Sequence, residues 1–212
     1  MSLPDLSRIK SVYLIGIGGS GMGPIAKILH EMGFRVMGSD LKESANTIRL
    51  RDLGIEVFLG HHRSHLRTAD LLVHSTAVLP DNVEMVEARA RDIPILRRAE
   101  ILAWIMSQSK KQIAVAGTHG KTTTTSMIAL LFEQGDLHPT FLIGADHSHI
   151  LLNAKKGEGR YVVAEADESD GSFLKLPVTH AVVTNIEDDH LDYYGTYEKV
   201  IEAFRRFIEG LP

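Results

Sequence analysis

Twice in this chain an apolar run of strand length leads into a glycine-rich turn and then into a helix-like pattern. Residues 12–17 lead into the turn at 16–21, and residues 112–116 lead into the turn at 117–122. Strands that alternate with helices in this way are typical of α/β proteins with a largely parallel sheet. We therefore expect an α/β fold with two such units.

The remaining elements follow the same alternation. A polar stretch at residues 107–111 separates two apolar segments, which predicts a Rossmann-like domain over 1–108 and a P-loop-type α/β domain over 109–212. Glycines 33 and 54 mark the expected ends of two helices. The other expected strands are residues 35–40, 71–75, 93–96, 161–165 and 181–185, and the expected helices are residues 22–32, 47–53, 82–91, 121–133 and 197–208.

Charge and composition exclude several classes of protein. The net charge of −4 argues against a broad nucleic-acid or membrane surface, so we expect neither as a partner. The chain has no cysteine, which excludes disulfides and thiolate metal sites. Its first residues lack a signal-peptide pattern, and no apolar run approaches membrane-spanning length. We expect a cytoplasmic protein.

The second glycine turn reads Gly-Thr-His-Gly-Lys-Thr from Gly117 to Thr122. Backbone N–H groups of such a turn can surround phosphate oxygens, and the following helix N-terminus adds positive potential. Lys121 can reach the β and γ phosphates, and the Thr122 hydroxyl can bind Mg²⁺. The loop is shorter than the usual P-loop, which has a glycine where this chain has Val115. The pattern predicts ATP binding, although a turn with glycines for geometry alone is the alternative.

The first glycine turn fits Gly-x-Gly-x-x-Gly over residues 16–21, and Asp40 follows 19 residues after Gly21. A dinucleotide fold places its ribose-binding acid near that position, so an NAD-dependent oxidoreductase is one interpretation. The pattern is not specific to nicotinamide, because it describes a diphosphate site. A diphosphate-linked substrate fits equally well, and a purely structural turn is also open.

Two acidic clusters follow expected strands, at residues 165–170 and 185–190. Ligands of open α/β sheets collect at the carboxyl ends of strands, and carboxylate oxygens are suitable ligands for Mg²⁺. We expect these clusters to face the phosphate loop, with His190 adding a nitrogen ligand or tuning the site. A solvated acidic loop is the alternative for either cluster taken alone. The pairs His61-His62 and His147-Ser-His149 lack further ligands at metal-site spacing, so surface or substrate contacts are expected there.

Several motifs in order resemble the Mur ligase family. The first-domain motifs are Gly-Ile-Gly-Gly-Ser-Gly-Met at 16–22, Gly-Ser-Asp at 38–40, Gly-His at 60–61, Ser-Thr-Ala-Val at 75–78 and Arg-Ala-Glu at 98–100. The second-domain motifs cover residues 116–124, 165–173 and 184–190. The form Asp-Glu-Ser-Asp-x-Ser-Phe is most similar to the members that join L-alanine to UDP-N-acetylmuramate. A murein-peptide recycling member is the alternative, and it usually has tyrosine where Ser169 stands.

The resemblance implies an ATP-dependent C–N ligase of peptidoglycan precursor synthesis. ATP phosphorylates the lactyl carboxylate of UDP-N-acetylmuramate, and the amine of L-alanine attacks the resulting acyl phosphate. The family pattern gives catalytic roles to Lys121, His190 and Glu165, and Mg²⁺ ligation to Thr122, Glu165 and His190. It implies ATP binding by Gly117, Thr118, His119, Gly120, Lys121, Thr122 and Thr123, and binding of the UDP substrate by Gly18, Gly19, Ser20, Gly21, Met22, Asp40, His61, Ser75, Thr76 and Arg98.

Three departures from the family pattern qualify the resemblance. Several relatives carry a carbamylated lysine after the His190 motif, but this chain offers only Lys199 there, so that modification is not expected. Gly144-Ala-Asp-His replaces a more usual Gly-Gly stretch. The family's third, C-terminal domain has no counterpart before Pro212, so we expect a fragment with an incomplete central domain that does not ligate alone. A noncatalytic nucleotide-binding module is a further alternative.

Overall fold

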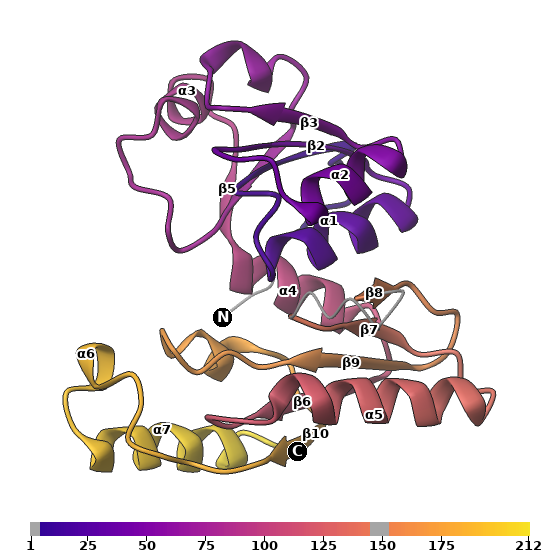
Figure 1. Cartoon of the computed structure of the whole chain (residues 1–212), viewed down its shortest axis with the longest axis vertical. Coiled ribbons are helices and arrows are strands. Elements are labelled where there is room, and N and C mark those ends of the chain that lie inside the picture. Colours follow the sequence, from indigo (N-terminus) through magenta and orange to yellow (C-terminus); the bar gives the residue numbers. More distant parts are fainter. Residues whose placement is uncertain (1–4, 145–152) are drawn as a thin grey trace. The chain divides into compact units, whose positions relative to one another are not determined.

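The computed structural model describes residues 5–144 and 153–212 (Figure 1). Contacts divide these residues into two compact units. The N-terminal unit consists mainly of residues 5–101, and the C-terminal unit consists of residues 102–144 and 155–212. The division falls within helix α4 (Arg98–Ser107).

The N-terminal unit is built on a five-stranded sheet with the order β3-β2-β1-β4-β5, in which every neighbouring pair is parallel. Its strands are β1 (Ser11–Ile15), β2 (Arg35–Asp40), β3 (Glu56–Leu59), β4 (Leu71–His74) and β5 (Ile95–Arg97). The helices between them are α1 (Met22–Glu31), α2 (Ala45–Asp52), the 3₁₀ helix η1 (Arg63–Leu66) and α3 (Val83–Ala90).

Strand β1 lies at the centre of this sheet, and all five of its residues are buried. The β2 strand pairs with one side of β1 and β4 with the other, so the strand order reverses at β1. Crevices form at the carboxyl ends of strands where the order reverses in this way. The glycine turn that follows β1 therefore starts at the position where α/β sheets bind ligands.

Helix α2 begins two residues earlier than the expected Thr47. The Ser44 side chain accepts a hydrogen bond from the Thr47 N–H, and the Thr47 hydroxyl oxygen accepts one from the Ser44 N–H. This reciprocal capping box satisfies backbone donors that a helix start leaves without partners. Apolar periodicity predicted the helix but could not locate this polar start.

The C-terminal unit contains a second five-stranded sheet, with the order β10-β6-β9-β7-β8. Strands β10, β6, β9 and β7 are mutually parallel. The strands are β6 (Lys111–Ala116), β7 (Thr140–Leu142), β8 (Ala154–Lys155), β9 (Tyr161–Glu165) and β10 (His180–Val183). The helices are α5 (Lys121–Gln134), η2 (Ser172–Lys175), α6 (Leu191–Tyr194) and α7 (Tyr197–Glu209).

Apolar contacts hold α5 against the sheet of this unit, and α7 against η2. Ala129 of α5 packs with Ile113, Phe141 and Val163 of the strands. The buried ring of Phe173 lies 4.9 Å from the ring of Phe207 in α7. Because α5 starts directly after β6, this packing fixes the turn between them.

The α/β prediction is confirmed in both units. Strands β2 and β9 have the expected bounds, and each of the other expected strands and helices differs from its expected bounds by one or two residues at an end. Among the described residues, the short elements β3, β7, β8, α6, η1 and η2 were not expected. Within the described part of the chain, no helix is long and apolar enough to cross a membrane.

Candidate functional site

The phosphate loop of the C-terminal unit requires glycine at both of its glycine positions. Gly117 has φ +128°, and a Cβ atom there would lie 2.1 Å from Thr184 Oγ1. Gly120 has φ +81° and is the residue before the first turn of α5. Residues other than glycine rarely adopt either backbone conformation. The expected loop between β6 and α5 is therefore present.

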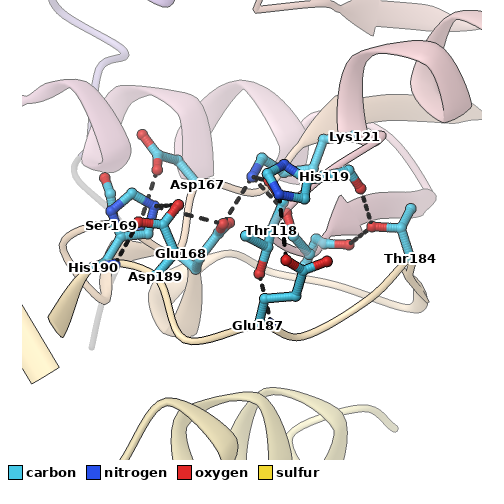
Figure 2. Close-up of polar contacts among 12 residues, drawn as sticks. Thr118, His119, Lys121, Asp167, Glu168, Ser169, Thr184, Glu187, Asp189 and His190 are labelled. Atoms are coloured by element: carbon cyan, nitrogen blue, oxygen red, sulfur yellow. Dashed lines mark hydrogen bonds and ion pairs between the residues drawn. The ribbon is translucent and has the colours of Figure 1, made fainter. Parts of the chain in front are cut away.

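The segment after β10, the strand beside β6, forms hydrogen bonds with this loop (Figure 2). The backbone oxygen of Asn185 accepts from the Thr118 N–H at 3.1 Å, and its Oδ1 accepts from the His119 N–H at 2.9 Å. Asn185 Nδ2 and Thr184 Oγ1 both donate to the His119 carbonyl oxygen, at 3.1 and 2.6 Å. The Glu187 N–H donates to Thr118 Oγ1 at 3.0 Å. The segment after β10 thus fixes the backbone of Thr118 and His119.

Lys121 folds back over its own loop. Its Nζ donates to the carbonyl oxygens of Gly117 and Thr118, at 2.5 and 3.3 Å. The same atom donates at 2.8 Å to Oε1 of Glu168, which forms an ion pair with it. The side chain of Lys121 is mostly buried, and that of Glu168 is 2 % exposed. The ammonium group is therefore held at the loop where a phosphate group of ATP is expected.

The Glu168 carboxylate lies between Lys121 and His190 (Figure 2). His190 Nε2 is 3.8 Å from Glu168 Oε1 and 3.7 Å from Asp189 Oδ2. The other carboxylate oxygen, Glu168 Oε2, is buried and has no hydrogen-bond partner among the described residues. Glu168 is a member of the predicted acidic cluster, but its position in the sequence did not distinguish it from the other carboxylates.

Tyr194 supports Glu168 from α6. Its hydroxyl group donates to the Glu168 carbonyl oxygen at 2.6 Å. Burial, followed by the nearby Tyr193 and the Glu168 carboxylate, raises the pKa of Tyr194 to about 12. The phenol thus stays a hydrogen-bond donor at neutral pH.

The residues predicted to hold Mg²⁺ are not all in contact. Thr122 lies in the first turn of α5, and Glu165 lies at the end of β9 with its Oε1 accepting from the Gly144 N–H at 2.8 Å. His190 instead faces Glu168 and Asp189. Among the residues that the structure describes, no three histidine, aspartate or glutamate side chains are grouped as a metal site. The ligand set Thr122, Glu165 and His190 stays a prediction, as does ATP contact by Thr123.

The N-terminal unit has a pocket of about 450 Å³ beside its glycine turn. Four of the predicted substrate-binding residues line it: Gly19, Asp40, His61 and Ser75. The remaining lining residues are Gly16, Leu41, Ala77, Val78, Leu79, Asp81 and Asn82. Residues from four segments, at or after the ends of β1, β2, β3 and β4, thus meet at the carboxyl ends of the strands.

Asp40 has a structural partner in this pocket. Its Oδ2 accepts from the Gly18 N–H at 2.9 Å, and Asn46 Nδ2 donates to the Gly18 carbonyl oxygen at 3.1 Å. Asp40 therefore fixes the glycine turn, in addition to lining the pocket.

The other predicted substrate residues differ in their access to ligand. Ser20 and Thr76 are exposed, whereas Met22 is almost completely buried and its N–H donates to the Gly19 carbonyl oxygen. The Arg98 side chain lies over Gly21, because a Cβ atom at Gly21 would be 2.8 Å from Arg98 Nη1. The surface or substrate contacts expected for His147 and His149 concern residues outside those described.

One polar residue of this unit was missed by the sequence analysis. Glu84 of α3 is completely buried, and its carboxylate contacts the side chains of His61 and His65. A glutamate within an amphipathic helix gives no sequence signal of burial, because this residue type is almost always exposed.

Comparisons with known proteins show which family the chain belongs to. Residues 11–110 match the family model described as "Mur ligase family, catalytic domain", and residues 115–212 match the "Mur ligase middle domain". A UDP-N-acetylmuramate–L-alanine ligase of Pelotomaculum thermopropionicum is 55% identical over 98% of this chain and 45% of its own length. The ligase of the same name from Agrobacterium fabrum is 53% identical over 100% of the chain and 44% of its length.

Solved structures give the same result. The UDP-N-acetylmuramate–alanine ligase of Thermotoga maritima has a TM-score of 0.89 at 34% identity, covering 95% of this chain and 47% of that one. A ligase for UDP-N-acetylmuramate and a peptide from Neisseria meningitides has a TM-score of 0.86 at 29% identity, covering 96% of this chain and 69% of that one. This chain spans less than half the length of the curated relatives named above. These relatives are ligases and not oxidoreductases, and both halves of the chain match models of one family, so the chain belongs to the Mur ligase family.

Proposed function

We propose that this chain carries the nucleotide-sugar and ATP-phosphate sites of a ligase that joins L-alanine to UDP-N-acetylmuramate. The substrate domain would cover residues 1–108 and the ATP-binding domain residues 109–212. The observation that carries the proposal is the ion pair of Lys121 with the buried Glu168 at a strand–glycine loop–helix motif. The names of relatives at 53% and 55% identity favour alanine as the amino acid, over the murein-peptide alternative. The cytoplasm is the proposed location.

In the proposed reaction, the lactyl carboxylate oxygen of UDP-N-acetylmuramate attacks the γ-phosphorus of ATP, and ADP leaves. The amine of L-alanine then attacks the carbonyl carbon of the acyl phosphate, and phosphate leaves as the amide forms. Lys121 would neutralise charge on the transferred phosphoryl group, because its ammonium already lies at the loop. Such catalysis depends mainly on positioning and on charge neutralisation.

The donor chemistry at this loop suits Mg²⁺-ATP. Glu168 Oε2 is a buried oxygen without a hydrogen-bond partner among the described residues, and carboxylates and a threonine hydroxyl are hard oxygen donors. Thr122, Glu165 and His190 would hold the metal. Mg²⁺ supplies positive charge to the phosphate oxygens of ATP. The chain's own contribution is to place Lys121 and to exclude water from the Glu168 carboxylate.

The pocket of the N-terminal unit would bind the UDP portion of the substrate. Its glycine turn offers backbone N–H groups to the diphosphate, and its other predicted contacts are Asp40, His61 and Ser75. The exposed residues Ser20 and Thr76 would add hydrogen bonds from the rim.

Isothermal titration calorimetry of this chain tests the proposal with two ligands. UDP-N-acetylmuramate should bind the wild type, and Lys121→Ala should leave its affinity unchanged. ATP with Mg²⁺ should bind the wild type and lose at least about tenfold in affinity in Lys121→Ala, since a hydrogen-bonded charge contributes roughly 1.5–3 kcal/mol. Absence of binding by UDP-N-acetylmuramate would contradict the proposed substrate, and equal ATP binding by both proteins would contradict the role of Lys121.

A further inference from the structure

The buried carboxylate of Glu84 is the centre of a polar network in the N-terminal unit. The residue is 0 % exposed, and its carboxylate contacts two histidine side chains. Five groups lie within hydrogen-bond distance of its two oxygens. Oε1 contacts Tyr13 Oη at 2.8 Å, His65 Nδ1 at 2.9 Å and the His62 N–H at 3.2 Å, while Oε2 contacts Ser39 Oγ at 2.6 Å and His61 Nδ1 at 3.0 Å.

The donors in this network follow from the groups that carry a proton to donate. Burial of Tyr13, together with the adjacent Glu84, raises the pKa of the phenol far above its ordinary value, so Tyr13 donates its proton to Oε1. Ser39 has one hydroxyl proton, and its shortest contact is with Oε2. His61 Nδ1 lies 3.0 Å from that same oxygen. Two lone pairs at this distance repel, so Nδ1 must carry a proton that it donates to Glu84.

This assignment determines whether the second ring nitrogen of His61, Nε2, donates or accepts hydrogen bonds. A neutral imidazole with a proton on Nδ1 has an unprotonated Nε2, which accepts hydrogen bonds. Within the described residues, the hydrogen bonds of the His61 ring are made by Nδ1 and none by Nε2, and His61 lines the pocket beside the glycine turn. The acceptor is therefore available to a ligand in this pocket.

His65 touches the same carboxylate and provides a contrast. Its ring stacks on Phe58, with the centroids 4.1 Å apart and an angle of 7° between the planes. His65 is not among the residues that line the pocket. One carboxylate thus orients two histidines, of which His61 alone reaches the ligand pocket.

We propose that Glu84 is a positioning residue that holds His61 with its proton on Nδ1, so that Nε2 accepts a hydrogen bond from an N–H or O–H donor of the bound nucleoside. This inference rests on the proposed binding of a UDP-linked substrate. Two parts of the pocket then contact different parts of the ligand. The glycine turn contacts the diphosphate, while His61 accepts a hydrogen bond from a donor of the base or of the ribose.

Nuclear magnetic resonance of the ligand-free wild-type chain tests the tautomer directly. Two-bond ¹H–¹⁵N correlations at a pH where the ring is neutral should show His61 with a protonated Nδ1 and an unprotonated Nε2. The His61→Gln spectrum assigns the signals. A protonated Nε2 with a bare Nδ1 would overturn the proposal, and this readout needs neither a ligand nor a Glu84 variant that folds.

Calorimetry with UDP and with inorganic diphosphate tests the role in binding. Glu84→Gln keeps the side-chain size but replaces one acceptor oxygen with an N–H donor. We expect this variant to bind UDP about tenfold more weakly, which is the loss of one good hydrogen bond, and to bind diphosphate as the wild type does. His65→Gln is the matched control, because it alters the same network away from the pocket, and its UDP affinity should stay close to that of the wild type. An equal loss for both ligands in Glu84→Gln would indicate general damage and overturn the proposal, as would an unchanged UDP affinity.

Modified ligands identify the donor with the wild-type protein alone. UDP methylated at the base nitrogen N3 lacks the base N–H, and 2′-deoxy-UDP lacks one ribose hydroxyl. The proposal expects one of the two, or the 3′-deoxy analogue, to lose about tenfold in affinity in the wild type and much less in His61→Gln. Equal affinities for all analogues would overturn it. If the wild type binds no UDP at all, the proposed substrate and the ligand part of this inference both fail, whereas the tautomer result stands by itself.

Discussion

The Nζ atom of Lys121 lies 2.8 Å from Oε1 of Glu168, a carboxylate that is almost completely buried. The pair joins the phosphate loop to the acidic segment after β9, two parts of the chain that are 47 residues apart. Because the second oxygen of Glu168 has no partner among the described residues, Lys121 is the main compensation for this buried charge. The ligand-free loop is therefore stabilised by the residue that we expect to bind phosphate.

Removal of the lysine should destabilise the protein as well as weaken ATP binding. Loss of one partner of a buried ion pair costs roughly 3–5 kcal/mol, and because Lys121 is partly exposed we expect Lys121→Met to cost about 3 kcal/mol. Urea denaturation monitored by circular dichroism measures this cost. The control is Lys155→Met, which breaks the more exposed 2.8 Å pair with Glu133 and should cost about 1 kcal/mol or less. Equal costs for the two variants would contradict the proposed importance of burial.

Replacement of Gly117 should disturb the loop more than replacement of another glycine with positive φ. A Cβ atom at Gly117 would meet Thr184 Oγ1 and, at 2.8 Å, the Asn185 carbonyl oxygen. Gly54 has φ +84° but no atom within 4 Å of such a Cβ. We expect Gly54→Ala to cost about 1 kcal/mol from backbone strain alone, and Gly117→Ala to cost roughly 3 kcal/mol because displacement of the backbone is added. Thermal unfolding of both variants measures the difference, and similar melting temperatures would show that the loop absorbs the extra carbon.

Acid should remove the stabilisation that Asp70 provides. Hydrogen bonds from the Lys10 N–H, and then from Ser11, hold the pKa of Asp70 below its usual range. A lowered folded-state pKa means that the stabilisation is complete above the unfolded pKa of about 3.9 and is lost as the pH falls through the folded value. We expect Asp70→Asn to be less stable than the wild type by about 1 kcal/mol at pH 7. Urea titrations from pH 7 to pH 3 should show this difference shrinking below about pH 4, and a difference that grows in acid would contradict the assignment.

Alkali should act through Tyr194. Its pKa of about 12 exceeds the value of about 10 for an exposed tyrosine, so the folded state keeps a proton that the unfolded state loses between these values. The stabilisation is therefore complete below about pH 10 and is lost as the pH rises towards 12. Absorbance at the wavelength of the phenolate should show two late-titrating tyrosines, Tyr13 and Tyr194, and the step near pH 12 should be missing in Tyr194→Phe. Titration of every tyrosine near pH 10 would contradict the burial of these two phenols.

The sequence predicted those features that depend on short-range chemistry. The glycines at 117 and 120 adopt the left-handed backbone that a phosphate loop needs, and the strand before them is buried as its apolar run indicated. The segment at 184–190 was expected near this loop, and Asn185 binds it directly. These patterns are local, because each residue type is required by the conformation of its own turn or strand.

Contacts between residues far apart in the chain could not be predicted from the sequence. Glu168 is one of four carboxylates in a row of six residues, and only the fold shows that it, and not Glu165, pairs with Lys121. Asp40 was expected to contact the substrate, and only the fold shows that its Oδ2 also accepts from the backbone of Gly18. Glu84 was missed because burial of a glutamate depends on donors from β1, β2 and η1 that come together only after folding.

The hydrogen bonds from Asn185 and Thr184 to the backbone of His119 have a consequence for the cost of binding ATP. A loop that is ordered only when its ligand arrives loses conformational entropy at that moment, which weakens the observed affinity. Here the neighbouring strand end has already restricted the backbone of Thr118 and His119 during folding. The entropy of ordering these residues is therefore part of the free energy of folding, and it would weaken the binding of the nucleotide only slightly.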